Sequence, residues 1–206
     1  MKNTILIDFD GVIRHWSHLE IDRLAKSLEL DLNPLFICAF ATRHLQPAIT
    51  GRITHEQWCE NVKLELSYKY DYQIATSLVD AWYNLSAEID LVFLDSIRTH
   101  APYCEIVLVT NATSRLNNDL INIGLEGAFD EIVNSSTIGV VKPKKAFFNK
   151  TMSLLDVSPT ECVFIDDSAK NVESARSLGM ASICHRSNKE TLEFLTKIFT
   201  QSSWSI

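Results

Sequence analysis

The chain has 206 residues, of which 46% are hydrophobic and 22% charged, a composition typical of a soluble globular protein with a substantial core. Its formal net charge of -7 argues against nucleic acid or an anionic membrane surface as the main partner. No apolar stretch reaches the roughly 20 residues that a helix needs to span a bilayer, so a membrane protein is not expected.

Short apolar runs rich in Ile and Val alternate along the chain with longer amphipathic segments. The runs that predict strands lie at 4–8, 105–110, 131–135, 162–166 and 181–184, the third being the weakest. Helical patterns lie at 87–100, 114–123, 144–155, 169–178 and 190–199. Because continuous apolar runs are typical of strands buried on both faces, the alternation predicts an α/β fold with a three-layer parallel sheet.

Residues 14–84 interrupt this alternation. The segment shows no convincing strand and has helical patterns at 19–29, 34–43, 55–66 and 72–83. Thr54 and Gln57 have the spacing of a capping box at the start of the third of these helices. We therefore predict an all-helical cap subdomain at 14–84, inserted into a core that consists of residues 1–13 and 85–206.

Acidic side chains directly follow two of the predicted strands. Asp8 and Asp10 come at the end of the first strand, and Asp166 and Asp167 at the end of the fourth. Ligands of open α/β sheets bind beyond the carboxyl ends of the strands, so these groups should converge. Four carboxylates do not all stay ionised together without a cation, and Lys142 alone supplies too little positive charge. Oxygen ligands favour a hard divalent ion, and we predict Mg²⁺ as the cofactor, with these four aspartates as candidate ligands.

The same groups predict phosphoryl transfer. Asp8 is the candidate nucleophile, because a carboxylate can form an aspartyl-phosphate. A phosphate dianion repels a carboxylate, so Mg²⁺ and Lys142 would have to neutralise both partners. Asp10 is the candidate acid and base, which protonates the leaving oxygen and then activates water. Thr110 and the backbone N–H groups around Asn111 would hold the phosphoryl oxygens.

Four short motifs, in chain order, resemble those of the haloacid dehalogenase-like (HAD) hydrolases. They are "DFDGV" (8–12), "VTNA" (109–112), "VKPKK" (141–145) and "FIDDSAKNVESARSLGM" (164–180), and they are spread over nearly the whole chain. The first and the fourth are the specific ones. The resemblance implies a Rossmann-like core with a mobile helical cap inserted after the first motif, and a Mg²⁺-dependent phosphatase that acts on a small phosphorylated substrate.

Position by position, the resemblance implies roles for residues of the first three motifs. Asp8 becomes the nucleophile, and Asp10 becomes the acid and base and also offers its backbone carbonyl to Mg²⁺. Thr110 and Asn111 contact the phosphate. Lys142 steadies Asp8 and the phosphoryl group.

In the fourth motif, the resemblance makes Asp167 the preferred metal ligand and Asp166 an outer or water-mediated one. Asn171 stands where some relatives carry a further aspartate, which weakens that outer contact. The cap segment "ITGRITHEQWCENV" (49–62) resembles family members that act on small phosphorylated metabolites, including sugar phosphates.

Three residues are candidate substrate contacts. His15 and Trp16 lie where the chain leaves the core for the cap, and Arg43 lies within the cap, where a surface position is the favoured alternative. Two other functions stay open: a phosphomutase, which shares every core motif, and a catalytically silent binding or regulatory module. A dehalogenase is disfavoured, because relatives with that activity lack the second aspartate of the first motif, which is present here as Asp10.

The five cysteines lie scattered, without a CxxC pair or a metal-like spacing. This pattern favours reduced thiols packed as small apolar side chains. Strand-like sequence begins at Thr4, which leaves no signal-peptide pattern at the N-terminus. We therefore expect a cytoplasmic protein; the sequence indicates no oligomeric state.

Overall fold

The structure is a computed structural model that describes residues 4–30 and 34–200. Its main sheet has five parallel strands in the order β5-β4-β1-β6-β7. These are β1 (Thr4–Ile7), β4 (Glu105–Thr110), β5 (Glu131–Asn134), β6 (Cys162–Asp166) and β7 (Ala181–Cys184). The predicted strands of the sheet are therefore confirmed, and β1 lies at its centre.

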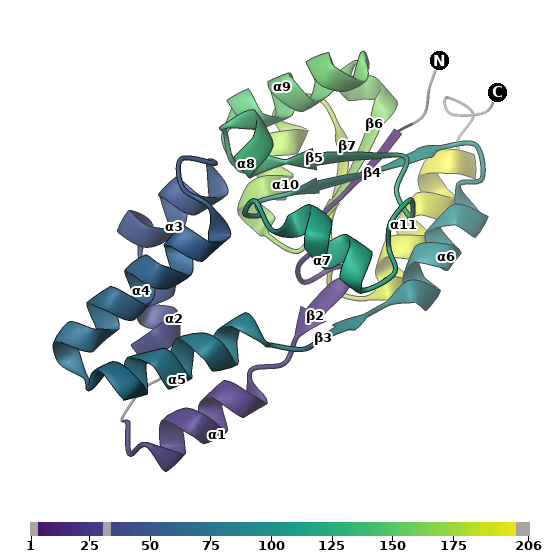
Figure 1. Ribbon diagram of the computed structural model, residues 1–206. Helices are drawn as coiled ribbons and strands as arrows, with labels where there is room; N and C mark the ends of the chain where they lie inside the picture. The colour runs from purple at the N-terminus through teal and green to yellow at the C-terminus, as the bar shows by residue number, and fades with distance from the viewer. Residues whose placement is uncertain (1–3, 31–33, 201–206) are drawn as a thin grey trace.

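Helices cover both faces of this sheet and complete a three-layer, Rossmann-like core (Figure 1). One face carries α6 (Leu91–His100), α7 (Leu116–Asn122) and α11 (Asn188–Thr200). The other carries α9 (Lys145–Leu155) and α10 (Ala169–Arg176), with the short α8 (Ser135–Ile138) and the 3₁₀ turn η1 (Pro159–Glu161) beside them. Within the described ranges, no helix combines the length and the apolar character that a membrane crossing needs.

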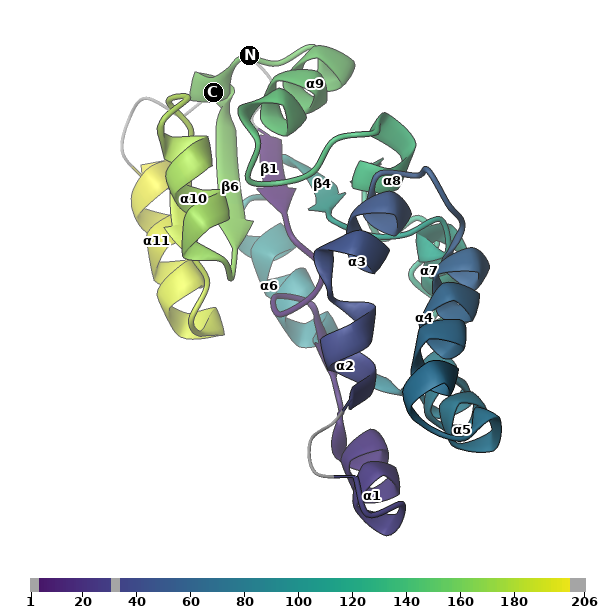
Figure 2. The same ribbon diagram turned by 90° about the vertical axis from the view of Figure 1, so that its left-hand side faces the viewer.

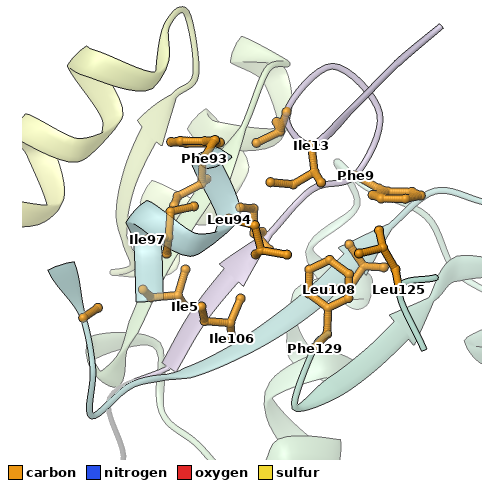
Figure 3. Packing of buried hydrophobic residues seen from close by; sticks show 14 of the residues in the cluster. Ile5, Phe9, Ile13, Phe93, Leu94, Ile97, Ile106, Leu108, Leu125 and Phe129 are labelled. Atoms are coloured by element: carbon orange, nitrogen blue, oxygen red, sulfur yellow. The ribbon is translucent and has the colours of Figure 1, made fainter. Parts of the chain in front are cut away.

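Successive side chains of β1 point to opposite faces of the sheet, as the pleat of a strand requires. Ile5 and Ile7 pack with Phe93 and the rest of the cluster under α6, which Figure 3 shows from close by. Leu6 points the other way and packs with Phe148 of α9. All five side chains are fully or almost fully buried. Burial on both faces is why the strand sequences read as continuous apolar runs.

The register of the sheet brings three strand ends to one place. Ile7 pairs with Leu108 of β4 on one side and with Ile165 of β6 on the other. The residues that follow β1, β4 and β6 therefore leave the sheet at a common edge. In Figure 2 the arrowheads of β1 and β6 point toward the side on which the helices of segment 14–84 lie.

The helices between Leu19 and Tyr83 form a layer of their own, which we call the cap. Its helices are α1 (Leu19–Ser27), α2 (Pro34–Ala39), α3 (Thr42–Ile49), α4 (His55–Lys69) and α5 (Tyr72–Tyr83). They enclose a separate hydrophobic core that includes Trp58, Val62 and Leu78. The predicted capping box is confirmed at the start of α4, where the side chains of Thr54 and Gln57 each accept a hydrogen bond from the other residue's backbone N–H.

The prediction of a single helix at 34–43 is wrong, because two helices, α2 and α3, occupy this region. The break lies at Ala41, whose backbone is extended with ψ of 138°. Alanine is a strong helix former, so nothing in the local sequence marks this turn. The break turns α3 toward the core, as the side-by-side position of α3 and α8 in Figure 2 shows.

The prediction that residues 14–84 contain no strand is also wrong. Arg14–Trp16 forms β2, which pairs antiparallel with β3 (Ala87–Ile89). Since β3 precedes α6, the helix predicted at 87–100 begins only at Leu91. Three-residue strands are too short to show the alternation that identifies a strand in a sequence. The two strands, hereafter the hinge ribbon, join the cap to the core; the domain boundaries at 13/14 and 84/85 stay predictions.

The cap rests on the core beside α8. Ser135 Oγ donates a hydrogen bond to the Ile49 carbonyl at 2.6 Å. Two residues farther on, Gly51 passes so close to the core that a Cβ there would lie 2.0 Å from the Ser136 carbonyl oxygen. Gly51 also has a φ of +70°, which side chains other than glycine's rarely allow. Position 51 therefore requires glycine for two reasons: the positive φ of its backbone and its close approach to Ser136.

We expect Gly51→Ala to lower the free energy of unfolding by on the order of 3 kcal/mol, through backbone strain together with the clash at Ser136. Gly124→Ala is the matched control, because Gly124 has a φ of +72° with nothing within 4 Å of its hypothetical Cβ. The control should lose only about 1 kcal/mol, the cost of the backbone strain alone. Urea unfolding of both variants measures the difference, and equal losses would contradict a close cap–core contact at Gly51.

Candidate active site

A buried ammonium group occupies the common edge of β1, β4 and β6. Lys142 Nζ lies 2.8 Å from Asp8 Oδ1 and 2.7 Å from Asp166 Oδ2, and it donates to the Val109 carbonyl at 2.9 Å. The Lys142 side chain is only 1% exposed. Burial lowers the pKa of Lys142, but the two carboxylates outweigh it and raise the pKa overall. The ammonium is therefore held charged between two strand ends.

Asp8 continues the sheet beyond β1, since its backbone N–H donates to the Ile165 carbonyl at 2.9 Å. Its Oδ1 accepts a hydrogen bond from the Phe9 N–H at 2.8 Å and faces Lys142. Burial raises the pKa of the Asp8 carboxyl, Lys142 opposes this, and the nearby Asp166 raises it further. A carboxylate under these conditions is short of positive charge, in spite of its ammonium partner.

Asp166 ends β6 and is completely buried. Besides Lys142, it accepts hydrogen bonds from Asn171 Nδ2, at 2.9 Å and 3.0 Å to its two oxygens, and from the Ser168 N–H at 2.8 Å. Asn171 is thus a donor that an aspartate at this position would not supply. These contacts satisfy Asp166 within the protein and leave it well placed to fix Lys142.

Asp167 completes the acidic group. Its carboxylate has an oxygen within 4.8 Å of oxygens of Asp8 and Asp166. Burial raises the pKa of Asp167, and Asp166 raises it further. A Cβ on Gly11, whose φ is +81°, would lie 2.4 Å from Asp167 Oδ2. Glycine in the first motif therefore makes room for the carboxylate of the fourth.

The charges of this group do not balance. Three carboxylates face one ammonium, so with all four ionised two negative charges are left over. The donors are oxygen atoms of the kind that hard divalent cations prefer. Both the excess charge and the raised pKa values of Asp8 and Asp167 fit a site for such a cation.

The Asp10 carboxylate takes a different direction. Its Oδ1 accepts from Arg14 Nε at 2.7 Å and from Trp16 Nε1 at 2.8 Å, and its Oδ2 accepts from Arg14 Nη2 at 3.0 Å. Arg14 is itself buried and pairs with Asp119 of α7 at 3.3 Å. The structure therefore gathers Asp8, Asp166 and Lys142, as the sequence predicts, but ties the Asp10 side chain to the hinge ribbon.

Thr110 and Asn111 follow β4 at the same edge. Thr110 is buried, with 1% of its surface exposed. The Asn111 side chain donates from Nδ2 to the Lys142 carbonyl at 3.0 Å and accepts at Oδ1 from the Lys142 N–H at 2.9 Å. The side-chain amide of Asn111 therefore positions the loop that carries Lys142, hereafter the lysine loop. The phosphate contacts of both residues stay predictions.

The three candidate substrate contacts lie in different surroundings. Trp16 lines a cavity between the cap and the core, beside Asp10. His15, the next residue in β2, is exposed. Arg43 is exposed on the cap, where it pairs with Glu65 outside this cavity. Of the three, Trp16 is the one that lines this cavity, and the substrate contacts stay predictions.

His55 makes a second contact between the cap and the core. Its backbone N–H donates to Ser114 Oγ at 3.0 Å, and its Nδ1 lies 3.0 Å from Thr113 Oγ1. Burial lowers the pKa of His55 to about 4, and the Arg115 guanidinium contributes to this shift. His55 is therefore neutral near pH 7, packed against the aromatic rings of the cap.

Comparison with known proteins places part of the chain in a recognised group. Residues 93–179 match the family described as haloacid dehalogenase-like hydrolase. Drimenol cyclase drtB of Aspergillus calidoustus is 41% identical over 71 residues, which are 34% of this chain and 13% of that protein. The glyceraldehyde 3-phosphate phosphatase of Methanocaldococcus jannaschii is 25% identical over 121 residues, 56% of this chain and 53% of that protein. The chain thus spans from about an eighth to about half of these relatives.

Solved structures match over most of the chain. A predicted HAD-like family hydrolase from Porphyromonas gingivalis superposes with a TM-score of 0.68 at 24% identity, covering 98% of this chain and 100% of that one. The HAD family enzyme BT-2542 of Bacteroides thetaiotaomicron, in complex with magnesium and inorganic phosphate, has a TM-score of 0.69 at 17% identity. That match covers 89% of this chain and 93% of the enzyme. At these identities the likeness is one of fold.

The low pKa of His55 predicts a specific loss of stability in acid. The folded-state pKa of about 4 lies below the ordinary 6.5. The contribution of neutral His55 to the free energy of unfolding is therefore complete above pH 6.5 and is lost as the pH falls toward 4. The loss is up to about 3 kcal/mol, from 1.36 kcal/mol for each pH unit. His55→Asn, which keeps a donor near Thr113, should show a shallower slope of unfolding free energy between pH 6.5 and 4. Parallel slopes in chemical denaturation would contradict the assignment.

Lys142→Met should leave Asp8 and Asp166 buried without their counter-charge. We expect the free energy of unfolding in metal-free buffer to fall by about 3–5 kcal/mol, the usual result of removing one partner from a buried ion pair. Lys144→Met, at an exposed position of the same loop, is the control and should stay within about 0.5 kcal/mol of the wild type. A similar small change in both variants would show that the ammonium contributes nothing to the fold.

Proposed function

This chain is a member of the haloacid dehalogenase-like hydrolases, and we propose that it is a Mg²⁺-dependent phosphatase of a small phosphomonoester. The observation that carries the proposal is the buried ammonium of Lys142, placed between two carboxylates at the carboxyl edge of the sheet. A site of this kind is suited to hold a phosphoryl group beside a nucleophilic carboxylate, because ammonium and metal ion together offset the negative charge of both.

Asp8 and Asp167 would hold the metal ion, together with the backbone carbonyl of Asp10. Asp166 is the positioning residue, since Lys142, Asn171 and a backbone N–H already use its oxygens. A bound Mg²⁺ would supply positive charge that neutralises the phosphate and draws it toward Asp8. The fold relative BT-2542, crystallised with magnesium and inorganic phosphate, supports this choice of ion.

We assign the attack on phosphorus to Asp8 Oδ2, because Oδ1 is engaged by Lys142 and the Phe9 N–H. The Asp8–phosphorus bond forms while the bond between phosphorus and the leaving oxygen breaks, and the leaving oxygen takes up one proton. Water then attacks the aspartyl-phosphate, which releases inorganic phosphate and restores Asp8. The overall reaction is a phosphomonoester and water giving an alcohol and phosphate.

Asp10 is the proposed source of the proton and later the base for water. In the arrangement described, its two oxygens are held by Arg14 and Trp16 of the hinge ribbon. To reach the leaving oxygen, its side chain would have to give up some of these contacts. Because the partners of Asp10 belong to the hinge ribbon, we propose that a movement of this ribbon controls when Asp10 acts.

The glyceraldehyde 3-phosphate phosphatase relative supports a small phosphorylated substrate. A phosphomutase would use the same groups, so the products distinguish the two: a phosphatase releases inorganic phosphate and a mutase returns a phosphate ester. The cytoplasmic location and the absence of nucleic-acid and membrane partners stay predictions from the sequence.

The experiment that tests the proposal is phosphate release from para-nitrophenyl phosphate with saturating Mg²⁺. Asp8→Asn should abolish turnover, and Asp10→Asn should lower kcat by about 10²–10⁴, the usual contribution of a general acid or base. Removal of the metal with EDTA should abolish activity reversibly. Asp95→Asn, at an exposed position of α6, is the control and should match the wild type.

Binding of Mg²⁺ followed by calorimetry gives a readout that does not depend on turnover. Asp167→Asn should weaken it, while the Asp95→Asn control should leave it unchanged. Near-wild-type phosphate release by Asp8→Asn would remove Asp8 as the nucleophile, and the absence of any heat with wild-type protein would remove the metal site.

A further inference from the structure

A cavity of about 140 Å³ lies between the cap and the core, next to the candidate active site. Its wall on the core side includes Asp10 after β1, and Asn111 and Thr113 after β4. These loops leave the same edge of the sheet as Asp8, which is two residues from Asp10. A group attached to a phosphate held at Asp8 would therefore extend into this cavity.

The wall on the cap side is aromatic. Phe36, Trp58 and Trp82 line it from the cap helices, Phe40 from the turn after α2, and Trp16 from the hinge ribbon. The rings interlock edge to face, with centroids 6.0 Å apart for Phe40 and Trp58 and 4.6 Å apart for Trp58 and Trp82. Such edge-to-face contacts stabilise the arrangement of the rings in this wall.

The charged groups at the cavity pair with one another. Arg14 binds both oxygens of Asp10 and one oxygen of Asp119, and Arg115 Nε forms an ion pair with the other oxygen of Asp119 at 2.9 Å that lacks hydrogen-bond geometry. Each carboxylate therefore has at least one guanidinium partner inside the protein. A hydroxyl group of a ligand would have to compete with these ion pairs for its own hydrogen bonds.

Four of the neutral polar side chains at the cavity, those of Trp16, Trp58, His55 and Asn111, also have partners within the protein. The Trp16 indole N–H donates to Asp10 at 2.8 Å, and that of Trp58 donates to the Ala39 carbonyl at 3.0 Å. The ring of His55 lies against Thr113, and the amide of Asn111 is engaged at both ends by Lys142. A sugar has several hydroxyls that lose their bonds to water on entering, and each left unsatisfied costs binding energy.

The size of the cavity matches a compact apolar group. An engineered protein cavity of about 150 Å³ with apolar walls takes up benzene. Rings at the walls also offer the edge-to-face geometry that aromatic ligands favour. A six-membered ring or a short branched alkyl group is therefore the kind of occupant that the walls accept.

From these observations we propose that the cavity binds the leaving group, and that the substrate is a phosphomonoester of an aromatic or compact alkyl alcohol. The proposal rests on the phosphatase function proposed above and narrows its substrate class. This substrate class differs from the sugar phosphates that the resemblance of the cap segment 49–62 suggests. The walls around the cavity select by apolar contact, and the phosphate end is held by the site at Asp8.

Binding of the alcohol alone tests the cavity without catalysis or metal. Cyclohexylmethanol, titrated in the presence of EDTA, should change the tryptophan fluorescence in a saturable manner, whereas glycerol at the same concentration should not. Phe40→Ala should weaken the binding by about fivefold, because Phe40 contributes apolar contact that alanine lacks. Phe40 is 52% exposed, so this variant is expected to fold.

Ile37→Ala is the matched control, since Ile37 is 64% exposed, lies three residues before Phe40 and does not line this cavity. It should bind cyclohexylmethanol as the wild type does. Absence of saturable binding, equal binding of glycerol, or equal loss in the two variants would overturn the proposal, whatever the protein does to phosphate esters.

Turnover supplies the second readout. With Mg²⁺, kcat/KM for cyclohexylmethyl phosphate should exceed that for glucose 6-phosphate and glycerol 3-phosphate by about tenfold or more. Phe40→Ala should raise KM for cyclohexylmethyl phosphate, whereas the Ile37→Ala control should leave that KM at the wild-type value. A preference for the sugar phosphate would overturn the proposal while the phosphatase function stands. Saturable alcohol binding without phosphate release from any ester would remove the leaving-group role together with the phosphatase function.

Discussion

The buried Lys142 ammonium is the contact on which the candidate site depends. The register of β1 with β6 places Asp8 beside Asp166, and two buried carboxylates so close repel each other unless a positive charge lies between them. Lys142 supplies that charge, and the amide of Asn111 holds its backbone at both ends. The ends of β1, β4 and β6 and the lysine loop are thereby joined by one set of charges and hydrogen bonds.

This arrangement was largely predictable from the sequence, because it follows from the sheet alone. Strands buried on both faces have continuous apolar runs, and parallel strands bring their carboxyl ends to one edge. Polar residues such as Asp8, Thr110 and Asp166 that end these runs must then lie close together. The hinge ribbon and the break at Ala41 were not predictable in this way. Their short lengths and ordinary residue types leave no periodic signal.

The direction of the Asp10 side chain is the part of the site that the sequence does not indicate. Asp10 and Arg14 are four residues apart, but they meet because the chain turns back on itself, as the hydrogen bond from the Gly11 N–H to the Arg14 carbonyl at 2.8 Å shows. Arg14 is fixed in turn by Asp119, which is 105 positions away in the sequence. A partner so distant has no local pattern, and only the packing of α7 against the loop brings it there.

Trp16 contacts both Asp10 and the aromatic cavity. Its indole N–H holds Asp10, the proposed acid and base, while its ring forms part of the wall of the aromatic cavity. Its backbone belongs to the hinge ribbon, where Trp16 in β2 pairs with Ala87 in β3. An occupant of the cavity would touch the same side chain that, together with Arg14, holds Asp10. Under the proposals above, recognition of the leaving group and placement of its proton donor would therefore share Trp16, and a ligand that fills the cavity would act on both.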